Sequence, residues 1–229
     1  CGPSITTACT SPATQITVGN QTGQNTTTTW PAPFGHWYRN AKHQFLFTAA
    51  ELNAMGFMGG KITQIAWQVT QINGQITYPN YRMSMGCTQI TNLTTWQTGL
   101  TQVLNPANYS IVVGWNNLNL TTAYEWDGVS NLIIEICYEL NANVTWTSNS
   151  ITPWTTTPFN STLYYYSDGI PACPATTTSF NSNPTNRPVT RFGWCPTTPD
   201  PNSFTYAWSP NVGINDSTLQ NPTLSPSLP

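Results

Sequence analysis

The fold class is predicted most clearly by the stretch Lys61-Ile-Thr-Gln-Ile-Ala-Trp-Gln-Val-Thr-Gln71. Within it, Ile65, Trp67 and Val69 alternate with polar or small residues. Successive side chains of a strand point to opposite faces, so this period of two predicts a strand with one buried face and one face in water. We therefore expect a protein built from antiparallel sheets.

Similar runs of β-branched and aromatic residues recur along the chain, bounded by Gly, Asn and Pro. We expect further strands at 44–47, 81–87, 109–113, 131–138, 162–166 and 188–192, and a weaker strand at 15–18. Many short strands at regular spacing are typical of a sandwich or jelly roll. The predicted fold class is therefore all-β, a jelly-roll-like antiparallel β-sandwich with a C-terminal extension.

Two short motifs between these runs predict local structure, one a helix and the other a turn. Thr48 and Glu51 fit a capping box and Gly56 supplies a stop, which predicts one short helix over 48–55. Asn73-Gly74 lies between two strand-like runs and predicts a hairpin turn.

Composition divides the chain into three parts. Residues 1–29 are rich in Thr, Ser and Gln and are expected to form an extended segment, whereas 30–195 contain the dense strand pattern of the sandwich. Residues 196–229 begin with a Pro-rich linker and contain one strand-like run at 204–208. A tail of this length cannot bury a core alone. It must pack on the sandwich, belong to a following module, or pair with a neighbouring chain.

The chain is unusually poor in charge. Its 229 residues include 6 basic and 8 acidic ones, and charged residues make up 6% of the sequence, against about 25% in an ordinary domain. Nucleic acid binding needs clustered Lys and Arg, and a membrane span needs a long apolar run, so neither is expected. Because a net charge near zero gives little repulsion between copies, we expect an extracellular protein that is glycosylated or assembles.

The cysteines form an even set without Cys-x-x-Cys spacing, beside only two histidines. Zinc sites need tighter spacing, so disulfides formed in an oxidising compartment are the better interpretation. We expect the pairs Cys1 with Cys9, Cys87 with Cys137, and Cys173 with Cys195. The alternative for the first residue is a lipid-modified lipoprotein terminus.

No set of side chains predicts catalysis. Glycoside hydrolysis needs two carboxylates flanking a bond, but Glu135 and Glu139 alternate on one strand face, where exposure to solvent explains them. A Gly-x-Ser-x-Gly elbow is missing, and His36 and His43 lack the spacing of a metalloprotease helix. We expect no enzyme, no catalytic residues, no cofactor and no metal.

Aromatic side chains supply the candidate ligand-binding residues. Asp127, beside Trp126 and Tyr124, is placed to hold a sugar or a cation, and Trp37 lies in a Pro and Gly-rich loop, 30–38, that we expect to be exposed. The alternative is that Asp127-Gly128 is a turn in which the carboxylate bonds local backbone.

Six segments of the dense strand region share a pattern with a known family: Gln44–Leu52, Gly60–Ala66, Gly114-Trp-Asn, Trp126–Cys137, Arg187-Pro and Arg191-Phe. Together they resemble a β-sandwich domain of surface adhesins of Bacteroidetes. In the tail, Phe204-Thr-Tyr-Ala-Trp208-Ser-Pro-Asn-Val-Gly213 resembles part of the Ig-like repeats of gliding-motility and type IX-secreted proteins. The resemblance implies secretion, surface display, and adhesion or structure, with no catalytic residues to carry over.

The expected function is that of an extracellular structural or adhesive module of a bacterial cell-surface protein that self-assembles into filaments. The alternative is a carbohydrate-binding module of a larger secreted protein. Expected partners are neighbouring copies or adjacent modules, and surface glycans. The candidate assembly residues are Phe204, Tyr206 and Trp208, and the candidate glycan site is Ser217, because Asp216-Ser217-Thr218 resembles the O-glycosylation motif of that phylum.

Overall fold

The computed structural model describes residues 9, 14–139, 148–179 and 181–196, together with the single residues 209, 215, 218 and 223. The chain divides into two compact units, Cys1–Thr197 and Thr198–Pro229. In the second unit, two hydrogen bonds join Asn215 and Thr223. The Asn215 N–H donates to the Thr223 carbonyl (3.1 Å), and the Thr223 N–H donates to Asn215 Oδ1 (2.7 Å). The predictions for Cys1, Phe204, Tyr206, Trp208 and Ser217 lie outside the described residues.

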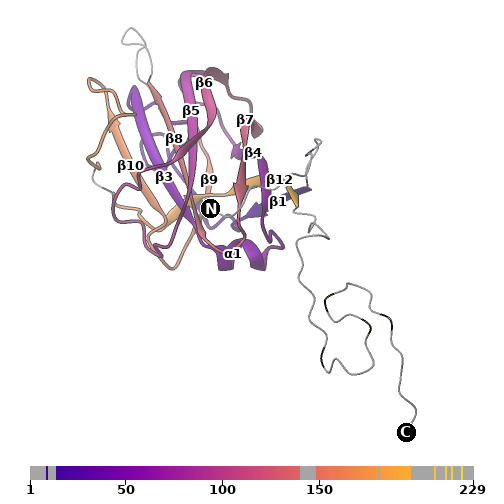
Figure 1. Ribbon diagram of the computed structural model, residues 1–229. Coiled ribbons are helices and arrows are strands. Elements are labelled where there is room, and N and C mark those ends of the chain that lie inside the picture. The colour runs from indigo at the N-terminus through magenta and orange to yellow at the C-terminus, as the bar shows by residue number, and fades with distance from the viewer. Residues whose placement is uncertain are drawn as a thin grey trace. The chain divides into compact units, whose positions relative to one another are not determined.

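The first unit is an all-β antiparallel sandwich with one short helix, as expected (Figure 1). One sheet has the order β1 (Thr14–Val18), β12 (Thr190–Pro196), β4 (Gly60–Val69), β7 (Gly114–Trp126). The other has the order β10 (Thr162–Ser167), β3 (Asn40–Phe47), β8 (Asn131–Glu139), β5 (Thr77–Thr88), β6 (Thr101–Ser110). A small third sheet has the order β11 (Asn186–Pro188), β9 (Pro153–Thr156), β2 (Gly23–Gln24).

Aromatic side chains fill the space between the two large sheets. Phe45 of β3 packs against Trp67 of β4 with ring centroids 5.8 Å apart, and Phe47 meets Phe192 of β12 edge to face at 5.0 Å. Rings of this size bury the most apolar area per residue, which explains how a chain poor in Leu builds a core.

The predicted alternation of buried and partly exposed side chains in residues 61–71 is confirmed. Ile65, Trp67 and Val69 are fully buried, whereas Gln64 and Gln68 on the opposite face are partly exposed. The Trp67 Nε1–H donates to Thr190 Oγ1 (2.9 Å), so its polar atom is satisfied inside the core.

The predicted helix is present as α1 (Ala49–Ala54). The Glu51 N–H donates to Thr48 Oγ1 and the Thr48 N–H donates to the Glu51 carboxylate, which completes the predicted capping box. Gly56 follows at φ +86°, a left-handed conformation that glycine adopts without strain.

The predicted hairpin at Asn73-Gly74 is wrong. Gly74 does turn the chain in the left-handed region (φ +67°). However, β4 pairs with β12 and β7, whereas β5 pairs with β6 and β8, so the turn carries the chain from one sheet to the other. The residues of the predicted strand 109–113 instead end β6 and lead into β7.

The predicted strand at 15–18 is confirmed as β1, which pairs with β12 from Thr14 opposite Trp194 to Val18 opposite Thr190. Since β1 and β2 both precede Trp30 and belong to sheets, the expected boundary between an N-terminal segment and the sandwich is not a structural one. Within the described residues, no helix has the length and apolarity that a membrane span needs.

Candidate functional site

Two disulfides are described, and they differ from the expected pairs. Cys9 is bonded to Cys195 and Cys137 to Cys173, with Cα atoms 5.7 and 5.4 Å apart. Cys87 is also disulfide-bonded. All three expected pairs are therefore wrong. They joined cysteines that are near in sequence, but β1 and β12 are neighbouring antiparallel strands, so the start of one lies beside the end of the other.

Among the described residues, no segment pairs with the outer edge of β1. Its backbone pairs with β12 on one side, and no described hydrogen bond joins residues 14–18 to backbone on the other side. An unpaired edge presents a row of N–H and C=O groups that can template pairing with another strand.

The other outer edges of the two large sheets are covered. Beside β10, the Ser179 N–H donates to the Tyr164 carbonyl (3.0 Å) and the Tyr166 N–H donates to Ser179 Oγ (3.1 Å). Between β6 and β7, Thr121 Oγ1 donates to the Val103 carbonyl and accepts from the Asn105 N–H, at 3.0 and 3.1 Å. The edge of β1 thus differs from the other three.

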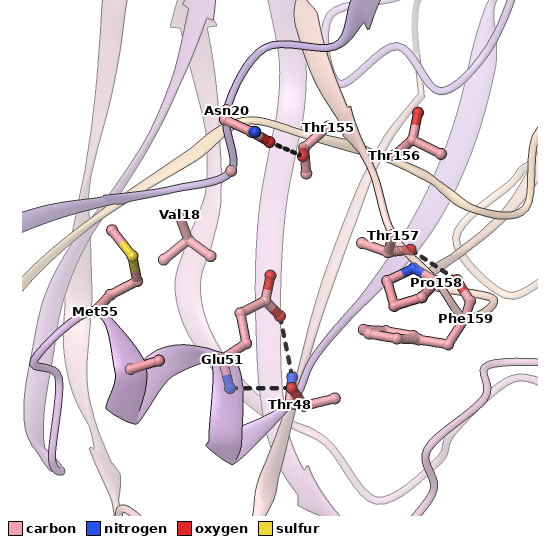
Figure 2. Close-up of a pocket in the computed structure, with 12 residues that line it drawn as sticks. Val18, Asn20, Thr48, Glu51, Met55, Thr155, Thr156, Thr157, Pro158 and Phe159 are labelled. Carbon is pink, nitrogen blue, oxygen red and sulfur yellow. Dashed lines mark hydrogen bonds between the residues drawn. The ribbon is translucent and has the colours of Figure 1, made fainter.

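A cavity of about 500 Å³ lies at the C-terminal end of β1, between this strand, α1 and the segment after β9 (Figure 2). Its lining is Val18, Gly19, Asn20, Thr48, Glu51, Ala54, Met55, Thr155, Thr156, Thr157, Pro158 and Phe159. The apolar members come from β1, from the C-terminal end of α1 with its cap Met55, and from residues 158–159. The threonines come from β9, the residue after it, and the N-cap of α1. A cavity of about 150 Å³ can hold a benzene ring, so this one has room for several apolar groups.

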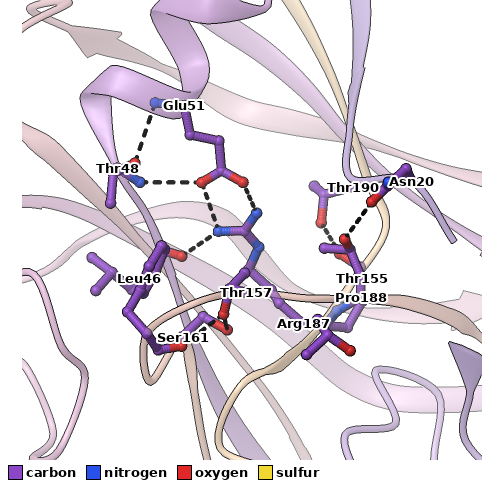
Figure 3. A network of polar contacts seen from close by, with 12 residues as sticks. Asn20, Leu46, Thr48, Glu51, Thr155, Thr157, Ser161, Arg187, Pro188 and Thr190 are labelled. Atoms are coloured by element: carbon purple, nitrogen blue, oxygen red, sulfur yellow. Dashed lines mark hydrogen bonds and ion pairs between the residues drawn. The ribbon is translucent and has the colours of Figure 1, made fainter. Parts of the chain in front are cut away.

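Below the cavity, Arg187 and Glu51 form an ion pair (Figure 3). Arg187 is fully buried; its Nη1 donates to Glu51 Oε2 (3.0 Å) and to the Leu46 carbonyl (2.5 Å), and its Nη2 pairs with Glu51 Oε1. The guanidinium also lies 3.9 Å from the Phe47 ring centre. Burial lowers the pKa of Arg187, while the hydrogen bonds and the charge of Glu51 act to raise it.

This ion pair fixes one wall of the cavity. Glu51 caps α1 and neutralises Arg187 of β11 with the same carboxylate, so it joins the helix to the small sheet. Sequence reasoning found Glu51 as a cap but missed Arg187 as its partner. A signal was available, because only six basic residues occur and one of them precedes a proline in a strand-like run.

The Trp126-Asp127-Gly128 segment is a structural turn. Trp126 is fully buried, packs against Phe57 with ring centroids 4.7 Å apart, and donates from Nε1 to the Ser130 carbonyl (2.8 Å). The Asp127 carboxylate accepts from the N–H groups of Val129 and Ser130 and from the Ser130 hydroxyl, at 2.7 to 3.0 Å. Burial pushes the pKa of Asp127 up, but these hydrogen bonds outweigh it and leave the pKa lowered.

A ligand-binding role for Trp126 is therefore wrong, since a buried ring cannot stack on a sugar. Tyr124 is half-buried and its hydroxyl donates to Cys87 Sγ (3.6 Å). Trp37 is half-buried, and its backbone N–H donates to Asn149 Oδ1 (2.9 Å).

The expected exposure of the loop 30–38 is also wrong. Trp30, Phe34 and His36 are buried, and Phe34 stacks on Tyr81 of β5 with ring centroids 5.7 Å apart. The Pro and Gly of this segment let it fold inward between the sheets rather than outward.

Each carboxylate in the described part of the chain already has a partner. Besides the contacts of Glu51 and Asp127, these are Glu125 with Lys61, Glu135 with Lys42 and Gln44, Glu139 with the Cys173 N–H, and Asp168 with the Arg39 N–H. Glu135 and Glu139 lie on one face of β8 as predicted, but this face is partly covered. Across the described residues, no group of three His, Cys, Asp or Glu side chains is placed to bind a metal ion.

A polar surface lies on the outer face of the sheet with the order β1-β12-β4-β7, called the β1–β7 sheet below. Gln15 Nε2 donates to Gln64 Oε1 (2.8 Å), and Gln64 Nε2 donates to Asn119 Oδ1 (2.7 Å). Gly193 lies between Gln15 and Gln64 in the sheet and leaves the space through which their amides meet. Next to this amide row, the Arg191 guanidinium stacks 3.8 Å from the Trp115 ring centre.

Comparisons with protein-family models, curated proteins and solved structures found no match.

Proposed function

We propose that this chain is a structural or adhesive module of a bacterial cell-surface protein, built to stay folded under tension. The bacterial surface is what the sequence resemblance implies, and the disulfides agree with an oxidising compartment. The observation that supports the mechanical role is the disulfide between Cys9 and Cys195.

This disulfide provides a covalent bypass around the sandwich. It joins two residues that are 186 positions apart in sequence, and every described strand lies between them except the last residue of β12. A force that enters before residue 9 and leaves after residue 195 passes through the sulfur–sulfur bond. The hydrogen bonds of the sheets then carry little of the force, because the covalent path cannot lengthen. A module that anchors a cell or links a fibre needs this property.

The carboxylates support a role without catalysis. A general acid or a nucleophile must be able to face a substrate. The six described carboxylates instead cap a helix, close a turn, or pair with a cation, an amide or a backbone N–H.

Single-molecule pulling tests the mechanical role. The chain is held through residues that precede Cys9 and follow Cys195, and its extension is recorded with and without a reductant. We expect the oxidised protein to lengthen only in its flanking segments. After reduction the enclosed 186 residues should unravel and add on the order of 600 Å. The Cys9→Ser/Cys195→Ser double variant should lengthen without reductant, and a wild type that lengthens equally when oxidised contradicts the proposal.

The second candidate function, carbohydrate binding, is supported by the outer face of the β1–β7 sheet. Amide groups beside a partly exposed aromatic ring, as at Gln64 and Trp115, can bond hydroxyls and stack on a sugar ring. A glycan array tests it. Saturable binding that is lost in Trp115→Ala and kept in Trp37→Ala would favour this function, whereas equal binding by both variants and the wild type would exclude this face.

A further inference from the structure

We propose that the open edge of β1 accepts residues 204–208 of a second copy as an added strand, and that the aromatic side chains of this segment fill the cavity beside Val18. The inference rests on the proposed function, because it names the partner of the same module.

The first argument is the edge itself. Residues 14–18 are Thr-Gln-Ile-Thr-Val, a run without charge, Pro or Gly. Natural sheets protect their edges with charged residues or proline, or with a segment that covers the edge. In the described part of the chain, neighbouring residues bond the edges of β6, β7 and β10, and β1 has neither form of protection. A strand added there would satisfy the free backbone groups of β1 by β-augmentation.

The second argument is the cavity. Ile16 and Val18 of β1 turn their side chains toward the core, and Val18 also lines the cavity. A strand placed beyond β1 in the same sheet would direct alternate side chains to that same side. The cavity of about 500 Å³ therefore lies where the core-facing side chains of one more strand belong.

The third argument is the pattern of the donor segment. Residues 204–208 are Phe-Thr-Tyr-Ala-Trp, so three aromatic residues alternate with a small or polar residue. In a strand, Phe204, Tyr206 and Trp208 share one face. This face suits the apolar lining contributed by Met55 and Phe159. Neither 201–215 nor β1 contains a charged residue, so pairing of the two strands meets no charge repulsion. Glu51, which also lines the cavity, is paired with Arg187.

The linker favours a second copy over the chain's own edge. Pro199 and Pro201 lie between β12 and the donor segment, and proline-rich sequences are extended and semi-rigid. A linker of this composition disfavours the return of residues 204–208 to the edge of their own copy. Each copy then offers an edge and a strand at different places, so the contact is heterologous and repeats as an open filament.

Variants of the donor test the proposal in the full chain. Tyr206→Asp places a charge on the aromatic face, whereas the matched control Thr205→Asp places the same charge on the opposite face. We expect Tyr206→Asp to weaken association, measured by analytical ultracentrifugation, by about tenfold or more, because a new carboxylate would leave water for a cavity lined by apolar side chains and the Glu51 carboxylate. Thr205→Asp should associate like the wild type.

Variants of the acceptor form the second pair. Met55 lines the cavity and Met58 does not, and both side chains are largely exposed, at 48% and 68%. Met55→Asp should weaken association as strongly as Tyr206→Asp does, and Met58→Asp should not. A synthetic peptide of residues 202–210 should bind the Tyr206→Asp protein saturably and should not bind the Met55→Asp protein.

Three results overturn the inference: a wild type that stays monomeric at high concentration, association that is equal in Met55→Asp and Met58→Asp, or a peptide that binds both proteins equally. The pulling experiment separates these failures from failure of the proposed function, since the disulfide acts within one copy and does not need the donor strand.

Discussion

Cys9 and Cys195 form a disulfide that joins the chain before β1 to strand β12. The bond fastens the one large-sheet edge that has no described covering segment. It therefore links the two proposals, because the strand that would receive a second copy is held covalently to the strand from which the tail leaves.

Removing this disulfide should destabilise the fold more than removing the shorter one. A cross-link lowers the entropy of the unfolded chain, and the effect grows with the enclosed loop. The loops span 186 residues for Cys9–Cys195 and 36 for Cys137–Cys173. We expect losses of about 2–5 kcal/mol for each double serine variant, with the larger loss for Cys9→Ser/Cys195→Ser. Urea unfolding measures both, and the reverse order would contradict the explanation.

Glu51→Gln should be strongly destabilising. It removes the charge opposite the fully buried Arg187 guanidinium, and an unpaired buried charge costs about 3–5 kcal/mol. The matched control is Glu125→Gln, which breaks a partly exposed pair with Lys61 and should cost at most about 1 kcal/mol. Urea unfolding measures both variants, and equal effects would show that the buried pair does not hold α1 to β11.

Stability should fall on mild acidification because of His43. Complete burial lowers the pKa of His43 to about 3, and its Nε2 accepts from the Ala32 N–H. In the unfolded chain the His43 imidazole has its ordinary pKa of about 6.5. It therefore binds a proton at a pH at which the buried imidazole of the folded chain stays neutral. The contribution is fully present above pH ~6.5 and falls by about 1.4 kcal/mol per pH unit below it, down to the folded pKa.

The measurement is urea unfolding between pH ~6.5 and ~5, where the carboxylates are still ionised. Burial also lowers the pKa of His36, so a smaller slope should remain after His43 is replaced. His43→Gln should lose most of the pH dependence, and an unchanged slope would show that another group is responsible.

Gly128→Ala should destabilise the turn that follows Trp126. Gly128 has φ +76°, and a Cβ there would collide with the Met58 carbonyl oxygen. We expect a loss above about 1 kcal/mol, because both the backbone conformation and the contact oppose a side chain. Gly169 has open space around its Cα, so Gly169→Ala is the control and should change thermal stability little.

Local patterns in the sequence predicted local structure well. The period of two around Trp67 and the capping box of Thr48 and Glu51 depend on neighbouring residues, and the structure confirms both. The polar strand β7 contains Asn116, Asn117 and Asn119, and Asn is depleted in strands, so its pattern was not recognised.

Features set by topology could not be predicted. The disulfide pairs follow from which strands become neighbours, and the order β1-β12-β4-β7 joins segments far apart in sequence. Asn73-Gly74 has the chemistry of a hairpin turn, but the strands on either side enter different sheets. Arg187 is charged, yet it is buried because Glu51 and the Leu46 carbonyl satisfy it, and these partners lie more than a hundred residues away.

Amide hydrogen exchange of β1 tests most directly whether copies meet at this strand. In an antiparallel pair only alternate N–H groups bond the neighbouring strand, so part of β1 faces outward. We predict that the outward-facing amides of residues 14–18 exchange rapidly in dilute protein and become protected as concentration rises, while Tyr206→Asp stays unprotected. Exchange that is equally fast, or equally slow, at all concentrations would contradict the account.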